Sequence, residues 1–151
     1  MKKISLLPVL ILVSVLTLSG CASIPLADLI DLSLEASPTE VVLGQANQYH
    51  QTVEMKWKIT NNSEQILTSE EYEFALMSAR AGETSSTLLK TLELTIEPNS
   101  EEEGAYDYFI DGIGVEGEFE FQWIVYEKIG DSFREIKKAI VPYMLNWESK
   151  E

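Results

Sequence analysis

Cysteine and histidine, two side chains that often act as nucleophile or general base, each occur once in this 151-residue chain, as Cys21 and His50. A structural zinc site takes about four Cys, His or carboxylate ligands, so this pair predicts no zinc site. His50 lies in a polar stretch and is expected to be a solvated loop residue. A nucleophilic triad is not predicted, because no serine stands in a Gly-x-Ser-x-Gly elbow and His50 has no recognisable partner.

Carboxylates are the other possible source of chemistry, since the chain has 25 Asp and Glu. One group could bind Ca²⁺ through oxygen ligands. These weak calcium candidates are Glu101, Glu102, Glu103, Asp107 and Asp111. Their spacing lacks the alternation of an EF-hand loop, so a solvated acidic loop is expected and no metal site is assigned. Nothing in the pattern selects two carboxylates for general acid–base catalysis. The sequence is therefore interpreted as non-enzymatic and without a cofactor.

The N-terminus has the three-part pattern of a secretory signal. Lys2 and Lys3 precede an uncharged, mainly apolar run to Leu18, and small residues then precede Cys21. The tetrapeptide Leu18-Ser19-Gly20-Cys21 resembles the lipobox of bacterial lipoproteins. The resemblance implies that a diacylglyceryl group is joined to the Cys21 thiol and that a signal peptidase cleaves between Gly20 and Cys21. Two or more acyl chains would hold the protein stably in a membrane.

Two other interpretations of this segment remain, an uncleaved membrane anchor and a buried, inert cysteine. The apolar run has about 15 residues, against roughly 20 for a membrane-spanning helix, which favours export. Residues 1–20 are thus the expected signal peptide and 21–29 the lipidated cysteine with a short tether. Ala22, in place of Asp, predicts sorting to the outer membrane if the host is Gram-negative. In a host with one membrane the domain would face outward from the cytoplasm.

The charge of the chain limits its partners. Without residues 1–20, which hold two lysines and no acid, the formal net charge moves from −14 to −16. Such a surface repels nucleic acid, where affinity comes from basic side chains that neutralise phosphates. Anionic lipid headgroups would repel it as well, so the lipid on Cys21 must hold it at the membrane. The expected partners are the membrane, through that lipid, and an envelope protein.

Alternating apolar and polar residues predict an all-β domain over residues 30–146, followed by a tail at 147–151. The clearest strands are Thr52–Thr60 and Gly117–Lys128, which place Trp57 and Trp123 on inward faces. Further strands are expected at Ile30–Glu35, Glu40–Leu43, Tyr72–Leu76, Leu92–Ile96, Tyr106–Ile110 and Phe133–Leu145. Pro142 suits an edge strand or a strand end. Seven or eight short antiparallel strands favour a β-sandwich.

Three segments carry a resemblance to bacterial immunoglobulin-like domains. Val53–Ser63 is similar to their second strand and its Asn-rich turn, Glu97–Ser100 to a later turn, and Gly117–Trp123 to their penultimate strand. The resemblance implies an immunoglobulin-like sandwich with a binding or structural role at the cell envelope. Ser63–Leu76 is loosely similar to a group of proteinase inhibitors, so an inhibitor or chaperone-like module is the first alternative. An acid-dependent envelope hydrolase is the less favoured one.

Overall fold

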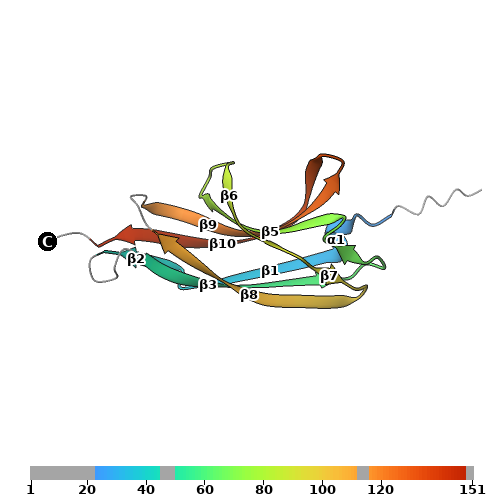
Figure 1. Cartoon of the computed structure of the whole chain (residues 1–151), viewed down its shortest axis with the longest axis horizontal. Coiled ribbons are helices and arrows are strands. Elements are labelled where there is room, and N and C mark those ends of the chain that lie inside the picture. The colour runs from blue at the N-terminus through green and yellow to red at the C-terminus, as the bar shows by residue number, and fades with distance from the viewer. Residues whose placement is uncertain (1–22, 45–49, 112–115, 149–151) are drawn as a thin grey trace, which may run out of the picture.

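The computed structural model describes residues 23–44, 50–111 and 116–148, and in these the chain is almost entirely β-structure (Figure 1). One helical turn, α1 (Leu26–Leu29), comes before the strands. The strands are β1 (Ile30–Ser37), β2 (Glu40–Leu43), β3 (His50–Asn61), β4 (Leu67–Thr68), β5 (Tyr72–Arg80), β6 (Ser86–Leu92), β7 (Thr95–Ile96), β8 (Ser100–Asp111), β9 (Gly117–Ile129) and β10 (Ser132–Trp147). The predicted all-β class is confirmed.

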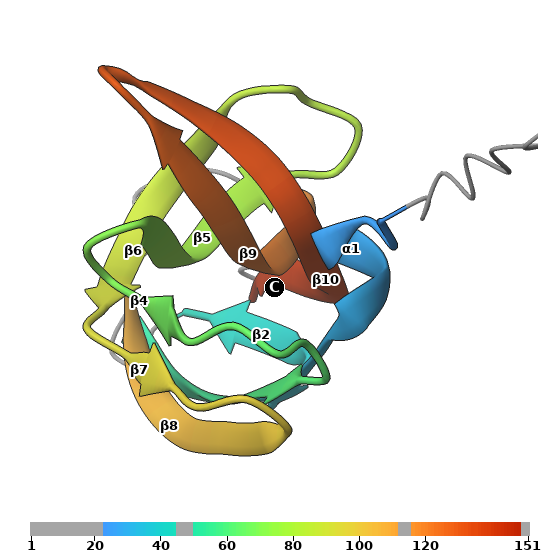
Figure 2. The same cartoon turned by 90° about the vertical axis from the view of Figure 1, so that its right-hand side faces the viewer.

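Two main sheets enclose the core. Sheet A has the order β1-β3-β8, and sheet B has the order β2-β10-β9-β5-β6. The short strands β4 and β7 pair with each other. Seen from the end, sheet B curls strongly, and its β9–β10 hairpin projects beyond the rest (Figure 2). The expectation of antiparallel pairing fails for β2, which runs parallel to β10 from Glu40 to Leu43.

The two predicted inward tryptophans form the centre of the core. Trp57 of β3 and Trp123 of β9 lie on facing sheets with their ring centroids 5.3 Å apart. The indole N–H of Trp123 also donates a hydrogen bond of 3.1 Å to the carbonyl of Lys58. Buried tryptophan needs such a partner for its one polar group. The pair therefore joins the middle strands of the two sheets by packing and by a hydrogen bond.

The sequence misplaced two strands around the acidic run. The expected strand at Leu92–Ile96 is wrong: β6 ends at Leu92, and only Thr95 and Ile96 form β7. The hydroxyl of Ser69 explains the interruption, because it accepts a 2.7 Å hydrogen bond from the backbone N–H of Leu94. The next strand, β8, is longer than expected and takes in the acidic run, which pairs with β3 instead of forming a loop.

Pro142 stands where β10 has a ladder partner on one side only, as suits an edge position. In sheet B, β10 lies between β9 and the short strand β2. The proline is tolerated because β2 pairs with β10 only from Met144 onward, and at Pro142 the ladder partner is Glu120 of β9. The outermost strands are β2 and β6 in sheet B and β1 and β8 in sheet A. A tight turn joins β9 to β10, with Gly130 at φ +61°.

The helix α1 lies within the segment expected to be a tether. The backbone N–H of Asn62 donates a 2.8 Å hydrogen bond to the carbonyl of Leu29, and the Lys137 ammonium donates one of 2.9 Å to the carbonyl of Ala27. The chain is thus part of the packed domain before β1 begins. Among the described residues, no helix is long and apolar enough to cross a bilayer.

Candidate functional site

The outer face of sheet A presents rows of charged side chains to solvent. Residues opposite one another in an antiparallel ladder lie on the same face of a sheet. The pairing of β1, β3 and β8 therefore forms one row of Glu35, Lys56 and Ala105, and the next of Ser33, Lys58 and Glu103. The lysines stand on the middle strand, between acidic outer strands. This arrangement suits recognition of a partner by charge.

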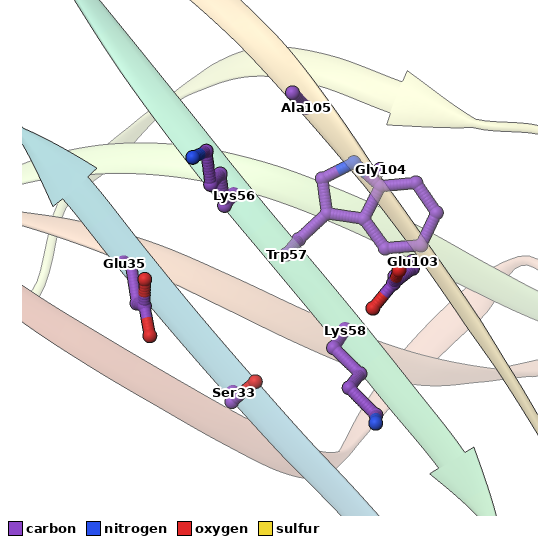
Figure 3. Close-up of a pocket in the computed structure, with 8 residues that line it drawn as sticks. All are labelled: Ser33, Glu35, Lys56, Trp57, Lys58, Glu103, Gly104 and Ala105. Atoms are coloured by element: carbon purple, nitrogen blue, oxygen red, sulfur yellow. The ribbon is translucent and has the colours of Figure 1, made fainter.

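A shallow hollow of about 440 Å³ lies in this face, at the centre of the three strands. Figure 3 shows its lining, with the indole of Trp57 lying across β8 at Gly104. Gly104 lets this indole pack closely against β8 on the inner side of the sheet, because a Cβ at this position would stand 2.6 Å from the Cζ2 atom of Trp57. The side chains of the outer face around the hollow, among them Glu35, Lys56 and Glu103, are polar or charged, while the ring of Trp57 is buried beneath the sheet.

Both lysines on this face are paired with carboxylates. The ammonium of Lys58 lies 2.6 Å from Oε2 of Glu101, and that of Lys56 lies 3.3 Å from Oε1 of Glu54. The hydrogen bond with Glu101, helped by the charges of Glu101 and Glu103, raises the pKa of Lys58. A lysine with a raised pKa stays protonated and is a poor nucleophile. The chemistry favoured here is therefore ion pairing and hydrogen bonding with a ligand.

The calcium candidates are dispersed by the strand that contains them. In β8, successive side chains point to opposite faces, so Glu101 and Glu103 share the outer face and Glu102 points the other way. Within the described residues, no group of three or more His, Cys, Asp or Glu side chains could hold a metal ion. The side chain of Asp111 lies outside the described part. The weak calcium hypothesis therefore gains no support from the geometry.

The remaining predicted residues lie apart from this face. Gly20 and Cys21 fall outside the described residues, so lipidation and cleavage stay predictions. His50 is exposed as expected but begins β3 instead of lying in a loop, and its ring packs at a tilt of 31° against Phe109 with the centroids 4.9 Å apart. The histidine therefore sits at one end of the domain, far along β3 from the hollow.

One polar residue had a role that the sequence did not reveal. Asn61 is completely buried at the end of β3. Its amide group donates hydrogen bonds to the carbonyls of Gln65 (2.8 Å), Ile96 (3.2 Å) and Glu97 (3.2 Å), while its Oδ1 accepts one of 2.6 Å from the Ser63 hydroxyl. The Asn-rich turn was predicted, but partners 35 residues away in sequence left no local signal.

Comparisons with known proteins define the fold more than the function. No family model and no curated protein matches the sequence. An alkylpurine DNA glycosylase from Pseudomonas fluorescens, solved bound to DNA with an abasic site analogue, matches over 78% of this chain and 30% of its own, with a TM-score of 0.56 and 8% identity. A β-glucosidase from Listeria innocua matches over 78% and 16%, with a TM-score of 0.47 and 11% identity.

A structural genomics target also matches, over 78% of this chain and 88% of its own, with a TM-score of 0.46 and 16% identity. This chain spans less than a third of the glycosylase and less than a fifth of the glucosidase. Likeness to the glycosylase at such low identity shows a shared backbone arrangement alone. The activities of these enzymes are therefore not carried over to this chain.

Proposed function

We propose that this chain is an exported bacterial lipoprotein, held by a lipid on Cys21, whose domain is a non-enzymatic binding or structural module at the cell envelope. The lipobox at residues 18–21 supports the anchor and the export route. The domain would face outward from the cytoplasm, at the outer membrane if the host is Gram-negative. Its ligand would be an envelope protein.

We further propose that the fold is an immunoglobulin-like sandwich. In such domains strands A, B and E form one sheet and G, F and C the other, with a disulfide joining B to F. The order β1-β3-β8 is compatible with A-B-E, and β10-β9-β5 with G-F-C. Trp57 and Trp123 then stand on strands B and F, where their 5.3 Å contact takes the place of the disulfide. This correspondence supports the resemblance of Gly117–Trp123 to the penultimate strand.

The observation that carries the binding role is the outer face of sheet A. Its rows of Glu, Lys and Ser side chains surround a shallow hollow. Acids outnumber lysines on this face, with Asp31, Glu35, Glu54, Glu101, Glu103 and Asp107 against Lys56 and Lys58. Complementary charge steers partners and fixes their orientation. A partner with basic side chains is therefore expected.

Photo-crosslinking in living cells tests this proposal. A photoreactive amino acid replaces Glu103 at the hollow, and a matched variant carries it in place of Glu83, an exposed acid in the β5–β6 connection. One dominant envelope protein should be captured from position 103 and not from position 83. Equal capture at both positions would refute the proposal that the outer face of sheet A binds the partner. Turnover of an envelope substrate, lost on mutating particular acids, would refute the non-enzymatic role.

The anchor is tested separately with Cys21→Ser. The unchanged protein should fractionate with membranes, and the variant should be released from them. Membrane association that persists in the variant would refute lipidation at Cys21.

A further inference from the structure

Exposed apolar side chains gather at the end of the domain where the chain arrives from Cys21. This tether-proximal end consists of residues 24–29, the β3–β4 connection at 62–66 and the β9–β10 hairpin at 128–133. Four large apolar side chains are exposed there: Ile24 (63%), Ile66 (45%), Ile129 (51%) and Phe133 (56%). Figure 2 looks at this end, with α1 on one side and the hairpin projecting on the other.

Hydrogen bonds tie each of these three segments to the packed domain. The Lys137 ammonium donates to the carbonyl of Ala27, which ties β10 to α1. The backbone N–H of Asn62 donates to the carbonyl of Leu29, which ties α1 to the β3–β4 connection. The hairpin is fixed in turn by a 2.9 Å bond from the N–H of Lys128 to the carbonyl of Glu71. The exposed apolar residues therefore belong to one end of a connected structure.

We propose that this tether-proximal end is a membrane-contacting surface, and that Ile24, Ile129 and Phe133 enter the interfacial layer of the bilayer that holds Cys21. The inference rests on the proposed lipidation of Cys21. It adds an orientation: the domain stands end-on, with the hollow of sheet A directed sideways.

The reach of the chain supplies the main argument. Only Ala22 and Ser23 separate Cys21 from Ile24. At about 3.3–3.6 Å per residue, three residues span at most roughly 11 Å. The polar layer on each side of a bilayer is about 5–8 Å thick, from the difference between its total and hydrocarbon thickness. Because the chain is bonded to the domain from α1 onward, a lipid on Cys21 places this end at the headgroups.

The side chains at this end suit the interface. Phe133 packs edge-on against Tyr126 with the centroids 6.3 Å apart. Tyrosine is enriched at the headgroup level, and phenylalanine is among the side chains that interfacial segments bury at the headgroup–acyl boundary. Between Glu127 and Lys138 the chain carries four basic and three acidic side chains, against a net charge of −14 overall. Lys128 and Arg134 flank the exposed residues of the hairpin. This segment therefore escapes the repulsion expected between acidic protein and anionic lipid.

Site-specific fluorescence in the lipidated, full-length protein tests the inference. A lipidated Cys21 thiol cannot react, so a single introduced cysteine takes up a polarity-sensitive dye alone. Ile129→Cys places the dye at the tether-proximal end, and Phe133→Cys serves as a second variant should the first fail to fold. Phe109→Cys is the matched control, because Phe109 is 53% exposed and lies opposite Thr52, roughly 30 Å along β3 from Asn61 at about 3.3 Å per residue.

In vesicles of phosphatidylethanolamine and phosphatidylglycerol, dye at position 129 or 133 should emit at shorter wavelength and be quenched by lipids brominated in their acyl chains. Dye at position 109 should emit as in water. Water-like emission at both hairpin positions, or equal quenching at position 109, would overturn the orientation. Dye uptake by the parent protein, which has no introduced cysteine, would show that the Cys21 thiol is free. That result would contradict the lipidation of Cys21 and not the end-on orientation, so the failure of one proposal can be told from the failure of the other.

Discussion

The middle strands of the two sheets, β3 and β9, are alike on one face and opposite on the other. Their inner faces meet through Trp57 and Trp123. On the outer face of β3 the side chains are charged and open to solvent, with Lys56 63% exposed. On the outer face of β9, Ile124 is almost completely buried. The outer face of sheet A is thus accessible to a partner, whereas part of the outer face of sheet B is buried and stabilises the fold.

The curl of sheet B explains the burial of Ile124. Its ladder partner on β5 is Ala75, which is also completely buried although it lies outside the main core. On the same face, the hydroxyl of Tyr126 donates a 3.5 Å hydrogen bond to Sδ of Met77. These four residues form a small second cluster on the outside of the sheet, as often occurs beside a main core.

Alanine at each tryptophan tests the similarity of the inner faces and should give the largest effect. Trp57→Ala and Trp123→Ala each remove a large buried ring, so each should lower the free energy of unfolding by about 3–5 kcal/mol. Trp123→Ala should cost more, because it also leaves the carbonyl of Lys58 without its donor. Urea unfolding followed by circular dichroism measures both. A loss at one position and none at the other would contradict the shared core.

Alanine at Ile124 and Lys56 tests the difference between the outer faces. Ile124→Ala should lower the free energy of unfolding by about 2–4 kcal/mol, because it opens a cavity in the second cluster. Lys56→Ala, on the matching face of β3, should change it by about 0.5 kcal/mol or less. The same urea titrations apply. If the two variants were equally stable, the curled face of sheet B would not contribute to the fold.

The two strands also show what the sequence could predict. β3 alternates cleanly because one of its faces is exposed to solvent, so its inward face was predicted, and its bounds were predicted to within two residues. β9 was placed correctly too, but a run from Phe121 to Val125 is buried on both faces. Alternation gives no sign of the second cluster, since Gln122 and Ile124 are covered through curvature and through strands distant in sequence.

Of the residues that line the hollow, only Glu103 was among the site candidates from the sequence, and it stood there as a weak calcium candidate. The acids of 101–103 were singled out, yet an unbroken charged run gave no strand signal, and their pairing with β3 depends on contacts about 40 residues away. Gly104 was not noticed, because its role depends on Trp57 across the ladder. The hollow therefore depends on which residues of β1, β3 and β8 stand opposite one another, and local sequence patterns do not determine this pairing.

A methyl group at Gly104 tests how closely Trp57 packs against β8. In Gly104→Ala the new Cβ would meet the indole of Trp57 at 2.6 Å, so Trp57 must shift within the core. Overpacking of this kind should lower the free energy of unfolding by about 1–3 kcal/mol. Ala105→Ser, on the adjacent exposed position, is the control and should be close to wild type. Unchanged stability in Gly104→Ala would show that Trp57 is not held against β8.

Alkaline pH should produce the smallest effects and distinguish the two faces by mechanism. Burial raises the pKa of Tyr143, which packs on Phe121 with the centroids 4.0 Å apart on the inner face of sheet B. On the outer face of sheet A, the hydrogen bond with Glu101 raises the pKa of Lys58. Both groups hold their protons more tightly in the folded state than in the unfolded state. Each therefore contributes stability that is present below its ordinary pKa, which is 10.0 for Tyr143 and 10.5 for Lys58. This stability is lost as pH rises through the pKa of the folded state.

Salt separates the two contributions. Ions screen an exposed pair such as Lys58 and Glu101 but hardly affect the burial of a tyrosine ring. The fall in urea midpoint above pH 10 should thus be less steep in Tyr143→Phe at any salt concentration, and less steep in Lys58→Met only at low salt. Unfolding titrations at several pH values, with and without added sodium chloride, measure this. If high salt abolished the fall in urea midpoint above pH 10, the role of Tyr143 would be contradicted. The whole loss of stability would then come from the charged face of sheet A.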